Sequence, residues 1–171
     1  IEKFNTLGDQ ASLHTFSEEI EVKENAALEY CKIQNDGGKA YQIINTNIRQ
    51  ADSSRVDTFT ITLSGQIVRN NFTITIAGEK CESHFNGLYM LNSNTLGDNH
   101  TVVDHQKPNS FSNEMYKGVL DSNSKGVFNG KIFVRPNAQK TNAFQSNRNI
   151  ALSPNATINT KPQLEIWADD V

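Results

Sequence analysis

Polar and apolar residues alternate with a period of two along most of this chain. The pattern is clearest in residues 26–34, 41–49, 58–65, 88–91 and 100–105. Successive side chains of a β-strand point to opposite faces, so the pattern predicts strands that bury one face each. No segment of ten or more residues has the apolar period of an amphipathic helix. The alternation therefore predicts an all-β fold.

Two internal repeats favour a solenoid. Residues 58–65 (TFTITLSG) return 13 positions later as residues 71–78 (NFTITIAG), and both copies place apolar residues on one face. We expect six of these side chains in the core: Phe59, Ile61, Leu63, Phe72, Ile74 and Ile76. A hairpin with a loop near residues 65–69 would also explain the spacing of 13.

The second repeat includes its corner as well as its strands. Five residues return 18 positions later with the same or a similar type. The first copy is Ile132, Val134, Pro136, Asn137 and Ala138, and the second is Ile150, Leu152, Pro154, Asn155 and Ala156. A strand and corner repeated at a fixed interval is typical of a stacked β-solenoid, and we interpret 18 residues as one coil.

Composition is consistent with one folded domain that has many tight turns. The 171 residues are long enough to bury a sizeable core, with 36% hydrophobic and 20% charged residues. Asparagine occurs 21 times, and it tolerates the left-handed backbone angles of tight corners. The net charge of −3 and the regular alternation argue against disorder.

Charge and hydropathy also limit the partners. The 16 basic residues are scattered among 19 acidic ones, so neither nucleic acid nor an anionic membrane is expected as a partner. No apolar run is long enough to span a membrane, and the N-terminus does not resemble a signal peptide. Cys31 and Cys81 are far apart and outside any CxxC pattern, which predicts two buried thiols in a cytosolic protein. The first residue is Ile1 and not methionine, so we expect a fragment.

One candidate for metal chemistry is the segment of residues 98–105. His100 and His105 are weak candidate metal ligands, because imidazole suits Zn, Fe or Cu. In a strand, however, His100 shares its face with Asp104, whereas His105 points to the other face. We therefore expect polar strand residues here and no metal site.

The second candidate is the acidic C-terminal segment. Leu164 and Ile166 are expected to point inward, with Glu165 and Trp167 on the outer face. Paired carboxylates can divide acid and base roles in glycoside hydrolysis. Asp169 and Asp170 are adjacent, however, and are expected in a corner that separates their directions. A turn or interface role is favoured for these six residues, and no self-contained catalytic motif is present.

The second half of the chain resembles the SufB/SufD family of iron–sulfur cluster assembly proteins, and within it the SufD branch. The segments that carry the resemblance are residues 98–105 (DNHTVVDH), 116–121 (YKGVLD), 126–132 (GVFNGKI), 138–143 (AQKTNA), 145–149 (QSNRN) and 160–171 (TKPQLEIWADDV). Residues 1–96 are only compatible with this family, in that strand-rich segments precede the same motifs. SufD is favoured because the comparable SufB stretch carries a cysteine near residues 145–147, where this chain has none.

The resemblance implies a right-handed parallel β-helix forming one core domain over residues 1–171, without the family's flanking helical regions. It implies a non-catalytic scaffold of a cytoplasmic assembly, paired with SufB and, in the full-length protein, bound to the SufC ATPase. It also implies that the Fe–S cluster and, in some systems, a reduced flavin belong to the intact complex and not to this chain. A cut solenoid leaves unpaired strand edges, so we expect self-association through the coil near residues 164–167.

Two other functions fit an all-β solenoid. A carbohydrate-active or carbohydrate-binding β-helix would show a secretion signal and rows of outer aromatic or acidic residues. Trp167 is the only tryptophan, and the acidic residues are dispersed. A left-handed hexapeptide helix of the acyltransferase type would explain 18 as three hexapeptides, but it does not explain the spacing of 13.

Overall fold

Twelve strands account for the alternating segments of the sequence. The computed structural model describes all residues, 1–171, and contains no helix. Six strands form one sheet: β1 (Glu2–Phe4), β3 (Ala27–Asn35), β5 (Arg55–Ser64), β7 (Glu82–Leu91), β9 (Phe111–Leu120) and β11 (Asn142–Ala151). Six form the other: β2 (Ser12–Val22), β4 (Ala40–Gln50), β6 (Ile67–Ile76), β8 (Leu96–His105), β10 (Lys125–Val134) and β12 (Thr157–Ile166). Accordingly, no helix is long and apolar enough to cross a membrane.

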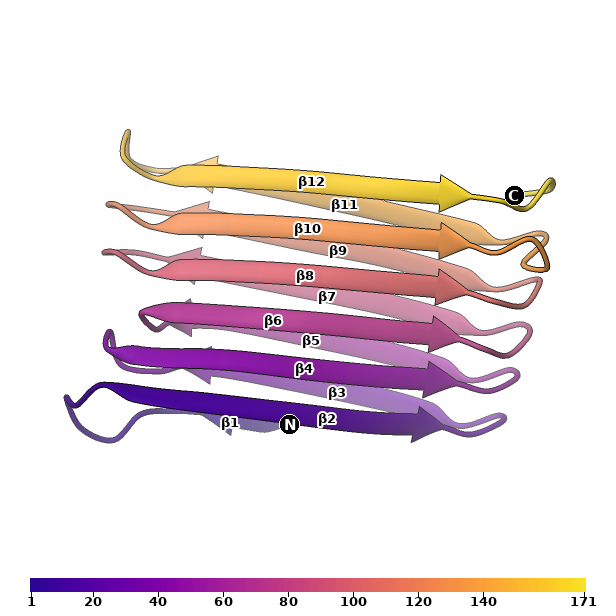
Figure 1. Cartoon of the computed structure of the whole chain (residues 1–171), viewed down its shortest axis with the longest axis horizontal. Helices are drawn as coiled ribbons and strands as arrows, with labels where there is room; N and C mark the ends of the chain where they lie inside the picture. The colour runs from indigo at the N-terminus through magenta and orange to yellow at the C-terminus, as the bar shows by residue number, and fades with distance from the viewer.

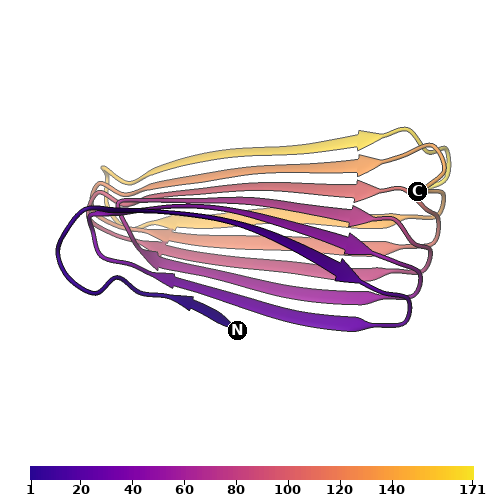
Figure 2. The same cartoon turned by 60° about the horizontal axis from the view of Figure 1, so that its bottom comes forward.

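The two sheets are parallel and wind as a right-handed solenoid. The strand orders are β1-β3-β5-β7-β9-β11 and β12-β10-β8-β6-β4-β2, so each strand pairs with the strand one coil away. In Figure 1 the even strands run left to right in front and the odd strands return behind them, while the chain rises from β1 to β12. Figure 2 shows the two layers joined by corners at both ends. The prediction of an all-β, right-handed parallel β-helix is confirmed.

One coil is longer than the sequence repeat indicated. Paired residues lie 26 positions apart at Tyr41 and Ile67 and 32 apart at Lys125 and Thr157. The interpretation of 18 residues as one coil is therefore wrong. Ile132 lies in β10 and pairs with Leu164 of β12, whereas Ile150 lies in β11 of the opposite sheet. The spacing of 18 is about half a coil, because each coil contains two strands and two similar corners.

The repeat at 13 residues also spans the two sheets, so the hairpin alternative is wrong. β5 and β6 belong to different sheets, and each pairs with strands one coil away. Equivalent residues take opposite faces, because the corner between β5 and β6 interrupts the alternation: Phe72 is 7% exposed, but Phe59 is 46% exposed. Ile74 and Ile76 are also buried. Ile61 is only half-buried, as is Leu63, which lies at a bulge in the register.

The inward face of β5 is instead formed largely by threonines, for a reason found in the neighbouring strand. Thr62 pairs in register with Gln34 of β3 and donates a 2.7 Å hydrogen bond to its Oε1 atom. Both side chains are fully buried or nearly so. A buried amide needs hydrogen-bond partners, so the threonine face points inward and the apolar face outward.

The apolar core surrounds this polar interior. Its larger cluster contains residues from both sheets: Val22, Ile48, Val56, Phe72, Ile74, Ile76, Cys81, Phe85, Val103, Ile132, Val134 and Ala138. A smaller cluster contains Tyr89, Leu91, Tyr116, Leu120 and Phe128. Cys81 is buried as expected, but Cys31 is only half-buried, and both thiols are free.

The corners that follow the even strands also stack in register. Each contains one non-glycine residue with a positive φ: Asn25, Ser53, Lys80, Asn109 and Lys140. Their backbone N–H groups donate to the next coil, for example from Ser53 to the carbonyl of Glu79 at 2.8 Å. Only two of the five are asparagines. The expectation that the asparagine excess serves left-handed corners is thus met in part, because other asparagines lie on strand faces.

Phe59 and Phe72, the two phenylalanines of the 13-residue repeat, allow a matched test of which face of each strand is buried. We expect Phe72→Ala to lower the free energy of unfolding by about 3–5 kcal/mol, because it removes a buried ring and leaves a cavity. Phe59→Ala should cost less than about 1.5 kcal/mol, because its ring is already half in water. Urea denaturation of both variants measures this. Equal losses would contradict the assignment of faces.

Candidate functional site

The two histidines lie on opposite faces of β8, as the alternation predicted. His100 points outward, with its Nε2 atom 2.9 Å from Oδ1 of Asp98. His105 is fully buried, with its Nε2 atom 2.8 Å from the hydroxyl of Ser112. Nowhere in the chain do three or more His, Cys, Asp or Glu side chains form a group that could hold a metal ion.

A continuous set of polar side chains runs inside the solenoid from the first coils to the last. We call it the interior polar seam, and it comprises Glu18, Tyr30, Lys32, Gln34, Gln42, Thr46, Thr62, Asn70, Asn99, Thr101, Glu114, Gln145, Asn147 and Asn149. Polar groups inside a protein are costly unless they are hydrogen-bonded. The seam therefore depends on internal partners.

At the β2–β3 end of the seam, a buried lysine meets a carboxylate. The Nζ atom of Lys32, whose side chain is 3% exposed, lies 3.0 Å from Oε2 of Glu18 and donates to Thr46 at 2.9 Å. Thr46 also donates to Glu18 at 2.5 Å. The phenol of Tyr30 donates to Glu2 at 2.5 Å. Thr46, Tyr30 and Glu2 thus lie around the ammonium group of Lys32 and the carboxylate of Glu18 that neutralises it.

Opposing effects set the pKa values of Lys32, Glu18 and Glu2. Burial lowers the pKa of Lys32, although Glu18 opposes that shift. Burial alone would raise the pKa of Glu18, but hydrogen bonds from Glu2, Thr46 and Lys32 lower it overall. Burial and the hydrogen bond to Glu18 raise the pKa of Glu2. The geometry is that of a buried ion pair, which holds two adjacent coils together.

The middle of the seam is a network of amides. Gln34 donates to Gln42 at 2.6 Å and to Asn70 at 3.0 Å. Asn70 donates in turn to Asn99 of the next coil at 3.1 Å. Gln34 and Asn70 each donate and accept, and the network links β3 to three even strands. Sequence reasoning missed these residues as a group, although their alternation with apolar neighbours in β3 and β4 was visible.

The C-terminal end of the seam contains a buried acid. Glu114 is 1% exposed and accepts a 2.6 Å hydrogen bond from Gln145. Burial raises its pKa. Its Oε1 atom has no partner within the protein, and neither do Thr101 Oγ1 and Gln42 Nε2. Such buried groups are the usual partners of internal water molecules.

Glycines beside the seam allow two tyrosine rings to lie across neighbouring strands. A Cβ atom on Gly87 would lie 2.1 Å from the ring of Tyr116, and one on Gly118 would lie 2.2 Å from the ring of Tyr89. Gly87 pairs with Tyr116, and Tyr89 pairs with Gly118, in the register of β7 and β9. The two strands thus interlock through reciprocal Tyr–Gly pairs.

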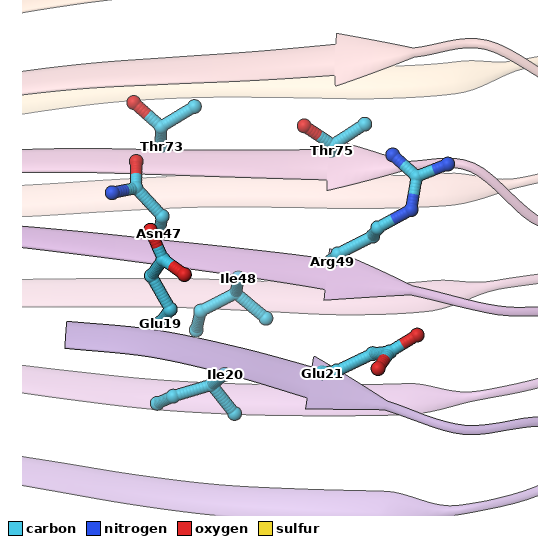
Figure 3. A pocket seen from close by; sticks show the side chains of 8 residues that line it. All are labelled: Glu19, Ile20, Glu21, Asn47, Ile48, Arg49, Thr73 and Thr75. Carbon is cyan, nitrogen blue, oxygen red and sulfur yellow. The ribbon is translucent and has the colours of Figure 1, made fainter.

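A shallow hollow of about 550 Å³ lies on the outer surface of β2, β4 and β6. Figure 3 shows the residues that line it: Glu19, Ile20, Glu21, Asn47, Ile48, Arg49, Thr73 and Thr75. The outward residues are carboxylates, one guanidinium group and hydroxyl or amide groups on three adjacent strands. The hollow contains no nucleophile next to a base. It is an open polar surface that sequence reasoning did not single out.

Four of the six residues of the C-terminal candidate lie on the expected faces: Leu164 and Ile166 on the inner face, Glu165 and Trp167 on the outer face. Leu164 and Ile166 of β12 pair with the inward Ile132 and Val134 but are 53% and 44% exposed, because they lie in the last coil. They border an apolar hollow of about 250 Å³. Asp169 lies in the corner that follows β12. The backbone of Asp170 bonds to the preceding coil, accepting from Lys140 N–H at 2.5 Å.

The outer face of the last two coils carries a stacked group that the sequence did not reveal. We call Lys131, Phe133, Arg135, Glu165 and Trp167 the terminal cluster. The rings of Phe133 and Trp167 stack with centroids 5.6 Å apart. The guanidinium group of Arg135 lies 4.7 and 5.0 Å from the two centroids. Lys131 forms a 2.7 Å ion pair with Glu165.

Comparison with known proteins identifies the family. The family described as "SUF system FeS cluster assembly, SufBD core domain" matches residues 1–171. The chain belongs to the SufBD core domain family. The resemblance noted from residue 98 onward therefore extends over the N-terminal half, which sequence reasoning considered only compatible.

Curated relatives agree with this family. An iron–sulfur cluster assembly SufBD family protein of Synechocystis is 36% identical over 90% of the chain. The iron–sulfur cluster assembly protein SufD of Escherichia coli is 30% identical over 100% of it. The chloroplastic protein ABCI7 of Arabidopsis thaliana is 32% identical over 90%. The matched regions cover 34%, 40% and 32% of these relatives, so the chain spans about a third of their length or slightly more.

The ion pair of Lys32 gives a test of the seam in this SufBD core domain. We expect Lys32→Ala to lower the free energy of unfolding by about 3–5 kcal/mol, because Glu18 loses its buried counter-ion. Lys23→Ala removes an ion pair of similar length, 2.6 Å to Glu21, between exposed side chains and should cost less than about 1 kcal/mol. Urea denaturation at pH 7 compares the two variants. Similar losses would contradict a structural role for the seam.

His105 predicts a dependence of stability on pH. Burial lowers its pKa to about 4, below the value of about 6.5 in an unfolded chain. Between these two pKa values the unfolded state binds more protons than the folded state. The contribution of neutral His105 to the free energy of unfolding is therefore full above pH 6.5 and is lost as the pH falls to 4. The loss amounts to about 3 kcal/mol.

Unfolding of the wild type and of His105→Gln, followed from pH 4 to 7, measures this contribution. The difference between the two profiles should change across that range, because glutamine does not titrate. A flat difference for His105→Gln would contradict the prediction.

Proposed function

We propose that this chain is the core of a non-catalytic scaffold subunit in Suf iron–sulfur cluster assembly, of the SufD type, and that it works in the cytoplasm. The observation that carries the proposal is the family match over all 171 residues. The identity of 30% to Escherichia coli SufD over the entire chain supports the SufD type. The carbohydrate alternative has no support from the family match.

We further propose that this core pairs with SufB and that the longer protein also binds the SufC ATPase. The last coil is the surface that we propose for the contact with SufB. Trp167 is 46% exposed, and it stacks on Phe133 beside Arg135. Tryptophan and arginine are the residue types that most often dominate binding energy at protein interfaces. The apolar hollow beside Leu164 and Ile166 adjoins this cluster.

The chain by itself is proposed to hold neither a cluster nor a flavin. A [2Fe–2S] or [4Fe–4S] cluster needs four protein ligands, most often cysteine thiolates. This chain has two cysteines, one on the outer face of β3 and one buried at a corner. These residues do not form a ligand set for a cluster, so cluster and flavin are proposed to belong to the assembled complex.

Co-expression with SufB and SufC tests the partner proposal. We expect the chain to co-purify with SufB, and Trp167→Ala to reduce the recovered SufB about tenfold or more, since a central aromatic contributes 2 kcal/mol or more to such interfaces. Leu13→Ala, at the opposite end of the solenoid and also exposed, is the matched control. If SufB does not co-purify, or if both variants behave alike, the proposed interface is wrong. Self-association through the last coil stays a prediction, which light scattering of the chain alone checks.

A further inference from the structure

The outer faces of the two sheets differ in chemistry at equivalent positions. At the fifth, seventh and ninth positions of the strands from β3 to β11, the odd sheet presents mostly apolar side chains. We call the apolar members of this set the apolar outer face: Cys31, Ile33, Phe59, Ile61, Leu63, Leu88, Met90, Met115, Val119 and Ile150. In β4 the residues paired with the fifth, seventh and ninth positions of β6 are Asn45, Asn47 and Arg49. At these outward positions of β4 to β12, the even sheet is apolar only at Val102 and Phe133.

This face is exposed and hollowed in the structure. Phe59, Met90 and Ile150 are 46%, 48% and 60% exposed. A hollow of about 300 Å³ at its centre is lined by residues of β5, β7 and β9, among them Ile61, Leu88 and Met115. A contiguous apolar surface of this kind usually marks an interaction site.

The dimensions of the face suit an α-helix. Five strands spaced about 4.8 Å apart give a stripe roughly 20–25 Å long, and positions five to nine span about 13 Å. An α-helix rises 1.5 Å per residue and is about 10–12 Å wide with its side chains, so about 16 residues would fill the stripe. Residues 1–171 form no helix, so a helix bound on this face comes from outside them.

The charged residues beside this face would set the direction of a helix that binds there. Lys117 and Arg148 continue the column of Ile33, Ile61 and Leu88 at the C-terminal end of the stripe. Neither forms an ion pair within the chain, although nine such pairs occur elsewhere. The C-terminal end of a helix carries partial negative charge, and acidic side chains in its last turn would add to it.

We propose that the apolar outer face binds an amphipathic helix of about 16 residues from another polypeptide, with an acidic C-terminal end over Lys117 and Arg148. This surface lies on the odd sheet, apart from the terminal cluster on the even sheet. The proposal therefore does not depend on the contact proposed for SufB.

Synthetic helical peptides test the proposal on the full 171-residue chain. One 16-residue peptide has a leucine face and glutamates in its last turn, the second has lysines in that turn, and the third has the first composition in scrambled order. We expect saturable binding of the first by fluorescence anisotropy, at least tenfold tighter than the second and third. The double variant Lys117→Glu/Arg148→Glu should reverse the preference between the first two.

Two variants and one native thiol locate the binding. Ile61→Asp, on the apolar outer face, should abolish binding, whereas Thr73→Asp, at the equivalent outward position of β6, should leave it unchanged. Cys31 lies on the face, paired with Phe59, so bound peptide should slow its alkylation about tenfold. Cys81 is 2% exposed and should stay unreactive throughout.

Three outcomes would overturn the proposal. The first is equal binding of the scrambled peptide. The second is binding that Ile61→Asp does not weaken while that variant keeps the wild-type circular dichroism. The third is a dimer of the chain alone that Ile61→Asp dissociates, since a second copy would then occupy the face.

Discussion

Parallel hydrogen bonding between successive coils is the interaction on which the rest of this structure depends. Each strand pairs in register with the strand one coil away, nearly without interruption from β2 to β12. Side chains at equivalent positions are therefore stacked in columns about 4.8 Å apart. A residue type that suits one coil must suit the coils on both sides of it. The corners after the even strands obey the same constraint, because each left-handed residue from Asn25 to Asn109 donates its N–H to the carbonyl of the residue that precedes the left-handed residue of the next coil.

The columns explain how a solenoid can contain a polar interior. An isolated glutamine or lysine inside a protein would lack partners. Here Gln34 bonds to Gln42, Asn70 and Thr62, which lie on three other strands of adjacent coils. Lys32 finds both Glu18 and Thr46 across the interior. The seam adds directional contacts to the apolar clusters around it, and these contacts disfavour a shift in register, which would leave every member unpaired.

The outer surfaces suit contacts with other proteins. The interior is filled by apolar clusters and the seam, so other molecules meet mainly the outer faces and the last coil. The even sheet is polar over most of its face and carries the terminal cluster at one end. The odd sheet is apolar at the same positions and carries two unpaired cations. A scaffold that positions several partners needs distinct surfaces of this kind, and this agrees with the place of the SufBD core domain in a cluster assembly family.

The sequence by itself determined the strands, the all-β class and the family. The period of two is a local property of the backbone, and it alone predicts that His100 and His105 lie on opposite faces and that Leu164 and Ile166 point inward. The alternation alone could not say which face of β5 is buried, because Phe59 and Thr62 are equally compatible with a strand. That choice depends on Gln34 of the preceding coil, which needs a hydrogen-bond donor. The length of a coil, the seam, the terminal cluster and the apolar outer face likewise emerged only from the tertiary structure, because each depends on residues of different strands that the parallel register and the packing of the two sheets bring together.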